Sequence, residues 1–443
     1  MSSSLMNGRA HSGAVITGAG LLTPLGGTLG ELSAALRDGT CALRPDLELG
    51  RNLPDEPGAA GERAVFAARI GEFGAAAAIE AGRRRRMPRL GQLAVVAAQR
   101  ALGLAPGAPA ASAGVVQRYG AERVAVVLGT GLGTLEMTVE FERSYIQGGA
   151  GAASPAVFPY TVMNTPAALI AMELGLLGPN QTVNHRDLSF CEALAAATEL
   201  LECGRADAVL AGGCDELGPW LVHGLSRLGA LPRGGAGALD QLAPSPPMHP
   251  YDRRRSGLLL GEGAVLVLLE RPEAAAERGA TVLARVAGIG RGGEDRPRLG
   301  WLRPGEPPAI EGAAAAIQQA LAEAGLMPDQ IDYISGSGNG TELDRVETAA
   351  LRRALGPAAE TARISSVLGQ SGEWLTSAGL RLGSALCALA EQQLPGTVLC
   401  SEPDPEASLP GLLLRPQPAT VRSVLLPCLA QGGGSVALVL STP

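Results

Sequence analysis

The chain is short of charged residues and of histidine, and these shortages exclude several classes of protein. Only 18% of its 443 residues are charged, and the formal net charge is −7. Proteins that bind nucleic acids need a basic surface to neutralise phosphates, so we expect no nucleic-acid partner. The histidines number four and lack the spacing of metal ligands; they are His11, His185, His223 and His249. The sequence therefore predicts no metal site.

Paired cysteines and long apolar runs are also missing. The seven cysteines are odd in number and show no paired spacing, which argues against a disulfide framework and fits a reducing compartment. The first residues, MSSSLMNGRAHSG, contain no apolar segment typical of a signal peptide. No uninterrupted apolar stretch reaches the roughly 20 residues of a membrane span. We therefore expect a cytoplasmic protein without a membrane partner.

Hydrophobic residues make up 46% of the chain, enough for a large globular core. Short apolar or β-branched runs, such as AVITGAG, RVAVVLGTG and DAVLAGG, alternate with Ala- and Leu-rich stretches. This pattern predicts an α/β protein with a mainly parallel sheet covered on both faces. Helices are expected near 89–103, 164–175, 188–203, 310–325, 342–355 and 376–392. The order of elements runs twice, which predicts two similar halves stacked sheet against sheet.

The segment GAGLLTPLG at 18–26 is similar to a dinucleotide-binding turn, but two features of that motif are missing. Thr23 stands where the third glycine belongs, and no acidic residue ends a second strand about 20 residues later. The segment therefore predicts a tight turn after a strand, and we expect no cofactor.

The segment VNHRDLSFCEAL at 183–194 combines a strand end, a turn and a helix start, where many α/β enzymes carry a nucleophile. Asp187 precedes the helix, and Ser189 with Glu192 forms a capping-box pattern. Cys191 lies about one turn inside the helix, where a cysteine packs as a small apolar residue. Taken locally, the pattern favours structural roles, including one for His185.

The wider sequence resembles the β-ketoacyl synthases of fatty acid and polyketide synthesis. The resemblance implies the thiolase-type fold, with five αβαβα layers built from two halves at 1–275 and 276–443, and a dimer. It rests on the order and spacing of AVITGAGLLTPLG, RRMPRLGQLAVVAAQRAL, GTGLGT, SPAVFPYTVMNTPAALIAMELGLLGPN, GRADAVLAGGCDEL, YDRRRSGLLLGEGAVLVLLE and DYISGSGNGTELDRVE.

In that family a cysteine takes the acyl chain from an acyl carrier protein, and two histidines stabilise the decarboxylated malonyl unit and its oxyanion. The resemblance places the cysteine at Asp187, the first histidine at Ser337 in a segment one residue short, and the second histidine at Glu373. A phenylalanine of the C-terminal Gly-rich loop falls on Gln431. A carboxylate is a poor acyl acceptor and opposes an oxyanion, so these degenerate positions predict no condensation by the chain alone.

The combination of a retained fold and a lost catalytic set is similar to the chain length factor, the non-catalytic subunit of type II polyketide synthases. The resemblance implies a heterodimer with a catalytic ketosynthase subunit, an acyl carrier protein as partner, and a shared acyl tunnel. Its lining would include Leu135, Thr138, Phe141 and Glu142, although an ordinary amphipathic helix explains the same spacing. The arginines at 83–86 could attract the acidic carrier protein, form a solvated face, or make a contact within the dimer.

Two alternatives stay open at this point. The chain could be an active acyl-transferring variant that uses Cys191, or Asp187 with Glu373, for different chemistry. It could also be a non-catalytic scaffold with a filled pocket.

Overall fold

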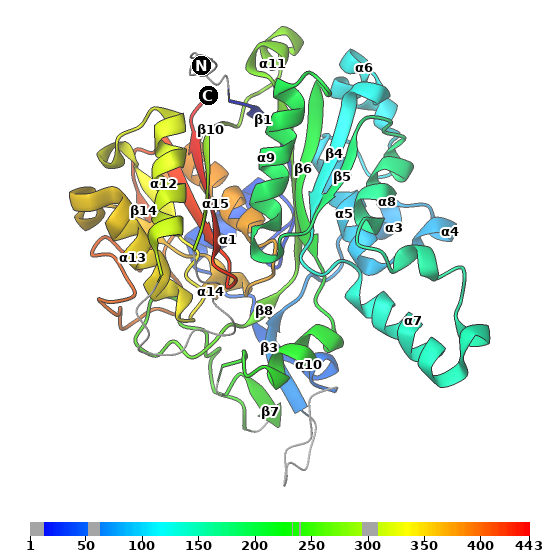
Figure 1. Ribbon diagram of the computed structural model, residues 1–443, viewed down its shortest axis with the longest axis horizontal. Coiled ribbons are helices and arrows are strands. Elements are labelled where there is room, and N and C mark those ends of the chain that lie inside the picture. Colours follow the sequence, from blue (N-terminus) through cyan, green and yellow to red (C-terminus); the bar gives the residue numbers. More distant parts are fainter. Residues whose placement is uncertain (1–12, 52–62, 233, 239–240, 295–308) are drawn as a thin grey trace, which may run out of the picture.

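The computed structural model describes residues 13–51, 63–232, 234–238, 241–294 and 309–443 (Figure 1). His11 and the first residues lie outside this part of the chain. None of the described helices is both long enough and apolar enough to cross a membrane.

Ten strands form the main hydrogen-bonded path, in the order β12-β11-β15-β16-β10-β1-β9-β6-β4-β5. Their bounds are β1 Val15–Leu22, β4 Val124–Gly129, β5 Asn180–Val183, β6 Ala208–Asp215, β9 Gly263–Glu270, β10 Ala284–Gly293, β11 Tyr333–Ser335, β12 Ile364–Ser365, β15 Ser423–Leu429 and β16 Gly434–Ser441. The shorter strands outside this path are β2 Arg44–Asp46, β3 Arg63–Ala68, β7 Ala236–Ala238, β8 Leu260–Gly261, β13 Gln393–Leu394 and β14 Gln417–Pro418.

Helices connect and cover these strands. They are α1 Leu29–Asp38, α2 Leu47–Gly50, α3 Ala75–Ala78, α4 Ala81–Arg84, α5 Arg89–Ala101, α6 Gly114–Tyr119, α7 Leu135–Gly148, α8 Thr165–Leu174, α9 Ser189–Glu202, α10 Pro219–Arg227, α11 Pro272–Arg278, α12 Glu311–Ala324, α13 Leu343–Leu355, α14 Leu368–Ser371 and α15 Ala378–Glu391. The six helices expected from the sequence correspond to α5, α8, α9, α12, α13 and α15, with ends shifted by a few residues.

The main path consists of two copies of one five-stranded sheet. Starting from β1 or from β10, each half lays out its first, last, fourth, second and third strand in the same spatial order. The last strand is antiparallel to its neighbours, and the second, third and fourth strands are parallel in both halves. Strands β1 and β10 join the halves through two residue pairs only. The duplicated order read from the sequence is therefore confirmed. The expectation of a mainly parallel sheet is wrong, because the last strand of each half returns antiparallel between its neighbours and five of the nine strand pairings in the main path are antiparallel.

Helices fill three layers around the two sheets. Helices α9 and α15 lie between the sheets, whereas α5 with α8 and α12 with α13 cover their outer faces (Figure 1). Glycines allow the outer helices to approach the strands closely: a Cβ on Gly20 would lie 1.9 Å from the Ala97 carbonyl oxygen, and one on Gly290 would lie 1.9 Å from that of Ala316. A glycine in close contact with a helix thus occurs in both β1 and β10, as expected for duplicated halves.

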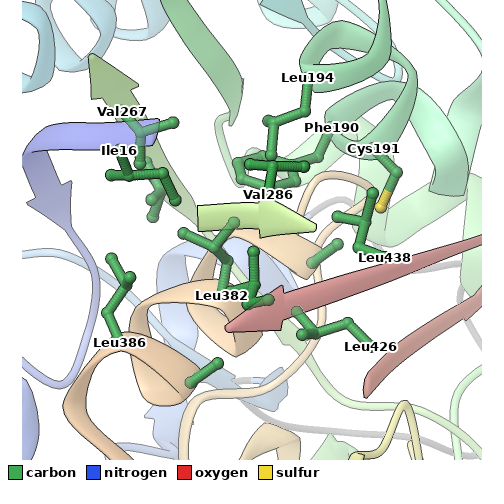
Figure 2. Packing of buried hydrophobic residues seen from close by; sticks show 14 of the residues in the cluster. Ile16, Phe190, Cys191, Leu194, Val267, Val286, Leu382, Leu386, Leu426 and Leu438 are labelled. Atoms are coloured by element: carbon green, nitrogen blue, oxygen red, sulfur yellow. The ribbon is translucent and has the colours of Figure 1, made fainter. Parts of the chain in front are cut away.

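The central layer carries the largest apolar cluster of the described residues. Figure 2 shows Phe190 and Leu194 of α9 opposite Leu382 and Leu386 of α15, with strand residues such as Val267 around them. Burial of this kind contributes about 25 cal/mol per Å² of apolar surface, which makes the central layer the main source of stability. It also fixes the N-terminal end of α9, where Asp187 is found.

Two features extend beyond the layers. A small sheet of β2, β3, β7 and β8 lies below them with α2 and α10, and α7 projects sideways from the body (Figure 1). The turn expected at 18–26 is present: Thr23 and Gly26 exchange two backbone hydrogen bonds of 3.1 Å directly after β1. It is a strand-to-loop turn, as the sequence predicted.

Candidate functional site

A cavity of about 460 Å³ lies where the carboxyl ends of parallel strands from both halves meet. Parallel strands commonly place ligand sites at this edge. Asp187 follows β5, Asp215 ends β6, Asn339 follows β11, Glu373 comes after β12, and Gln431 follows β15. The duplication therefore brings residues that are far apart in sequence into one site.

The wall of the cavity is mostly apolar. Leucines come from α10, from the loop before β8 and from the residues around α7, and Trp374 adds an aromatic surface. The full apolar lining is Leu132, Leu135, Leu221, Leu225, Leu228, Leu258, Leu260, Leu343, Trp374 and Leu375. A long, flexible, apolar chain is the kind of ligand that suits such a wall.

Asp187 is held at the cavity by a strained turn. Arg186 has a φ of 49°, which is rare for a residue with a side chain, and it turns the chain between β5 and α9. His185 N–H donates to the Ser189 hydroxyl at 2.8 Å, and that hydroxyl donates to the Arg186 carbonyl at 2.7 Å. The turn thus sets residue 187 just before the N-terminal end of α9, where a nucleophile would stand.

The Asp187 carboxylate accepts hydrogen bonds from backbone N–H groups at the cavity. Backbone N–H groups of Asp187 and Gln431 stabilise its charged form. Burial acts more strongly and raises the pKa of Asp187 overall, and the nearby Arg186 charge offsets part of this effect. Two converging N–H groups could stabilise an oxyanion if they were free. Here both are hydrogen-bonded to the Asp187 carboxylate.

Glu373 faces the same cavity and bonds to Asn339. The Asn339 amide donates to the Glu373 carboxylate at 2.8 Å. Burial, with a smaller contribution from the negative charge of Asp187, raises the pKa of Glu373 to about 8. Glu373 therefore carries a proton at neutral pH, and the two acids share the cavity with at most one full negative charge between them.

Ser337 does not line the cavity. Its backbone N–H and its hydroxyl both donate to Glu347 at 2.7 Å, and Glu347 also accepts from the Tyr251 hydroxyl at 2.6 Å. Asn339, two residues later, provides the polar group of this segment at the cavity instead. Ser337 has both of its polar groups bonded to Glu347, which is the physical reason that it does not face the cavity.

The predicted tunnel residues divide into two groups. Leu135 and Gln431 line the cavity. Thr138 donates to the carbonyls of Thr134 and Thr161, and Phe141 packs against Phe158 with ring centres 5.7 Å apart. Thr138, Phe141 and Glu142 lie outside the cavity lining of the single chain, so their tunnel role stays a prediction for an assembled complex.

Three further carboxyl groups at the cavity were not anticipated from the sequence. Asp215 accepts hydrogen bonds from Thr130, Gly131 and Thr376, which ties loops of both halves together, and burial raises its pKa to about 6. Glu216 accepts from the Leu90 N–H at 3.0 Å, and burial raises its pKa to about 7. Glu136 accepts from the Trp220 N–H at 3.0 Å. Their hydrogen-bond partners lie in loops and at helix N-termini that are distant in sequence, so no local motif predicts these contacts.

The balance of charge in the cavity is acidic. Its lining contains five carboxyl groups, Glu136, Asp187, Asp215, Glu216 and Glu373, and Arg186 as its one basic side chain. An enolate or an oxyanion formed here would meet negative charge or groups that are already hydrogen-bonded. The arrangement can hold an apolar chain but lacks the electrophilic groups that condensation needs.

Cys191 is turned away from the cavity. It is fully buried in the central layer and lies 3.0 Å from Cys428, measured between the two sulfur atoms. The expectation that it packs inside the helix is met, and its use as a displaced nucleophile at this cavity is contradicted by its position. Among the described residues, no group of His, Cys, Asp or Glu side chains could hold a metal ion.

Glu373→Gln is expected to stabilise the protein at alkaline pH. Because the folded pKa of about 8 lies above the ordinary value of 4.5, the folded state binds the proton more tightly, and stability falls as pH rises through this window. The amide removes this loss, so we expect a gain of up to about 5 kcal/mol at pH 8.5 and little gain at pH 4.5. Urea unfolding at both pH values measures it; an equal effect at the two would show that titration of Glu373 is not responsible.

The sequence matches one family of enzymes over most of its length. Residues 12–275 match the N-terminal domain of β-ketoacyl synthases, and residues 284–401 match the C-terminal domain. A 3-oxoacyl-(acyl-carrier-protein) synthase 2 of Synechocystis is 28% identical over 401 residues, which cover 89% of each chain. Nodulation protein E of Rhizobium leguminosarum bv. trifolii is 32% identical over 400 residues, which cover 89% of this chain and 90% of that protein.

Solved structures show the same architecture. The structure described as the ishigamide ketosynthase/chain length factor matches with a TM-score of 0.80 and 26% identity, covering 97% of this chain and 99% of that chain. These findings confirm the thiolase-like fold. The names of the relatives include both a synthase and a chain length factor, so the residues of the site must decide between these roles.

Proposed function

Because the chain belongs to the β-ketoacyl synthase family, we propose that it is a chain-length-factor-like subunit, which shapes an acyl tunnel for a partner that performs the condensation. The partner would carry the Cys-His-His set and join carrier-bound malonyl units to a growing polyketide, polyene or fatty acyl chain. The two family halves would correspond to 1–275 and 276–443. The observation that carries the proposal is Asp187 at the head of α9, hydrogen-bonded to the donors that a thioester intermediate would need.

Other features of the site support this role. The resemblance assigns Glu373 to the second histidine position and Ser337 to the first, and Ser337 is hydrogen-bonded to Glu347. The cavity remains open at about 460 Å³ with a wall of leucines, which argues against a scaffold with a filled pocket. A retained cavity without a nucleophile is what a tunnel-shaping subunit requires.

The surface around α7 supports a partner subunit. None of the residues of α7 is buried, and Ile146 is 78% exposed, Tyr145 53% and Phe158 56%. Strand β5 ends the main path of strands beside this region, with one neighbour, β4, among the described residues. An exposed apolar patch next to an open sheet edge favours association with another subunit.

Co-expression with candidate ketosynthase subunits, followed by size-exclusion chromatography, tests the heterodimer. We expect a 1:1 complex, and we expect Ile146→Asp to abolish it while leaving the unfolding temperature unchanged, because this side chain is exposed. Met327→Asp is the matched control, since Met327 is 64% exposed and lies beyond α12 on the other side of the body. A stable monomer at micromolar concentration with every candidate partner would contradict the proposal.

An acyl carrier protein is the second proposed partner. Arg83, Arg85 and Arg86 are exposed around α4, and Arg83 forms an ion pair of 3.2 Å with Glu173. This basic group could attract an acidic carrier protein to the complex. Charge reversal at Arg85 and Arg86 is the corresponding test, with carrier-protein affinity as the readout at low and physiological salt.

One observation favours a second candidate function. Asp187 and Glu373 form a pair of carboxyl groups in one cavity, one of them protonated at neutral pH, which is an arrangement for acid–base chemistry on an acyl group. In this case the chain alone would hydrolyse or transfer carrier-bound acyl groups. Loss of such activity in both Asp187→Asn and Glu373→Gln would favour this candidate; no activity in the unmodified chain would exclude it.

A further inference from the structure

Two cysteines from opposite halves of the chain meet beneath the cavity. Cys191 is in the first turn of α9, and Cys428 is near the end of β15. Cys191 donates a hydrogen bond to Cys428 with 3.0 Å between the sulfur atoms, and the two residues are 0% and 3% exposed. Figure 2 shows Cys191 among the buried side chains of the central layer, on the side of α9 that faces Leu438. Both thiols are free.

A buried cation lies against this pair. Arg381 of α15 is 3% exposed, and its guanidinium donates to the Cys428 sulfur at 3.5 Å. Its other contacts are the backbone carbonyls of Ser335 and Pro427. No carboxylate of the described residues lies within ion-pair distance of it. Because an unpaired charge is costly to bury, Arg381 favours a thiolate on Cys428.

The chemistry of the two sulfur atoms is unequal. The hydrogen bond from Cys191 and the charge of Arg381 lower the pKa of Cys428 to about 7, although burial opposes this. The pKa of Cys191 is raised, first by the hydrogen bond to Cys428 and then by burial. The contact with Arg381 thus favours a thiolate on Cys428, with the Cys191 thiol beside it, and a thiolate next to a second sulfur is what disulfide formation needs.

We propose that Cys191 and Cys428 are a redox-active pair that a small hydroperoxide converts to a reversible disulfide between α9 and β15. The Cys428 thiolate attacks one peroxide oxygen, an S–O bond forms, the O–O bond breaks, and the leaving oxygen takes a proton. The Cys191 sulfur then attacks Cys428, the S–S bond forms, the S–O bond breaks, and water leaves. The two thiols lose two electrons and two protons, which reduce the hydroperoxide, and a dithiol reverses the change.

The position of the pair links this bond to the cavity. Cys191 follows Asp187 by four residues, and Cys428 precedes Gln431 by three, and both of those residues line the cavity. A disulfide needs about 2.05 Å between the sulfur atoms, so the two sulfur atoms must approach each other by roughly 1 Å, and the bond would then tie α9 to β15. The disulfide would therefore restrain the segments that carry Asp187 and Gln431, on two sides of the cavity, relative to each other.

The test treats the purified full-length chain with hydrogen peroxide, blocks the remaining thiols by alkylation, and maps the peptides by mass spectrometry. We expect a Cys191–Cys428 linked peptide, loss of two hydrogen atoms from the intact mass, a higher unfolding temperature, and reversal by dithiothreitol. Cys428→Ala should abolish all four changes. Cys214→Ala is the matched control, because Cys214 is equally buried but has no cysteine beside it.

Other outcomes would overturn the proposal. One is that both thiols stay reduced at a peroxide concentration that oxidises the exposed Cys203. Another is that Cys428 becomes a sulfinic acid with no linked peptide. Should Cys428→Ala fail to fold, Arg381→Lys gives a second test: it keeps a cation but loses the guanidinium contact, so disulfide formation should be slowed at least several-fold, and an unchanged rate would count against the role of Arg381.

Discussion

An Asp187→Cys variant of this chain is expected to show no condensation activity on its own. The substitution restores a thiol at the head of α9, but the resemblance places Ser337 and Glu373 at the positions where the chemistry needs two imidazoles, and Ser337 is bonded to Glu347. A positioned group that transfers a proton typically raises the reaction rate by about 10²–10⁴-fold. A site without both imidazoles should therefore be at least ~10⁴-fold slower than a complete one. Release of carbon dioxide from a malonyl carrier protein measures this directly.

The control for this variant is acylation, which needs only the thiol. If Asp187→Cys becomes acylated by an acyl donor but does not condense, the loss lies in the histidine positions, as the structure indicates. Measurable condensation by the single variant would mean that the acidic groups of the cavity can replace the imidazoles, and the proposed division of labour would be wrong.

Replacing Leu135 by Ala is expected to shift the products of the complex toward longer chains. Leu135 lines the cavity at the start of α7, so its removal extends the space available to a growing chain. It is partly exposed, and the cost in stability should lie below the ~2–5 kcal/mol typical of a fully buried leucine. Leu135→Trp should do the reverse and shorten the products. Mass analysis of released chains measures both.

Val139→Ala is the matched control, because Val139 is on the same helix but is not part of the cavity lining. It should leave chain length unchanged. Phe141→Ala and a bulky replacement of Thr138 test the part of the predicted tunnel that lies outside the cavity of the single chain. If an active, folded complex gives the same chain length with all of these substitutions, α7 does not set product length.

The fold could be predicted from the sequence because its signals are local and repeated. The alternation of apolar strands with helical stretches recurs in both halves, and each half then assembles in the same strand order. The turn at Thr23 and Gly26 was predicted for a similar reason, since the residues that form it are adjacent. What local pattern could not give is the projection of α7, because its amphipathic spacing predicts a buried face and none of its residues is buried.

The site was predicted in part. Asp187, Glu373, Leu135 and Gln431 lie at one cavity, and the roles that the resemblance implies for them stay predictions. Ser337 does not line this cavity, because its backbone N–H and hydroxyl are both bonded to Glu347. The acidic lining and the contact of Cys191 with Cys428 were missed, since their partners are distant in sequence: the two cysteines are 237 residues apart.

The central claim is that this chain shapes the tunnel and holds no acyl intermediate of its own. The most direct measurement is intact mass spectrometry of both subunits after a co-purified ketosynthase complex has been incubated with an acyl carrier protein donor. The account predicts an acyl adduct on the partner subunit and none on this chain, with the same outcome for Asp187→Ala. A stoichiometric acyl adduct on this chain would contradict it.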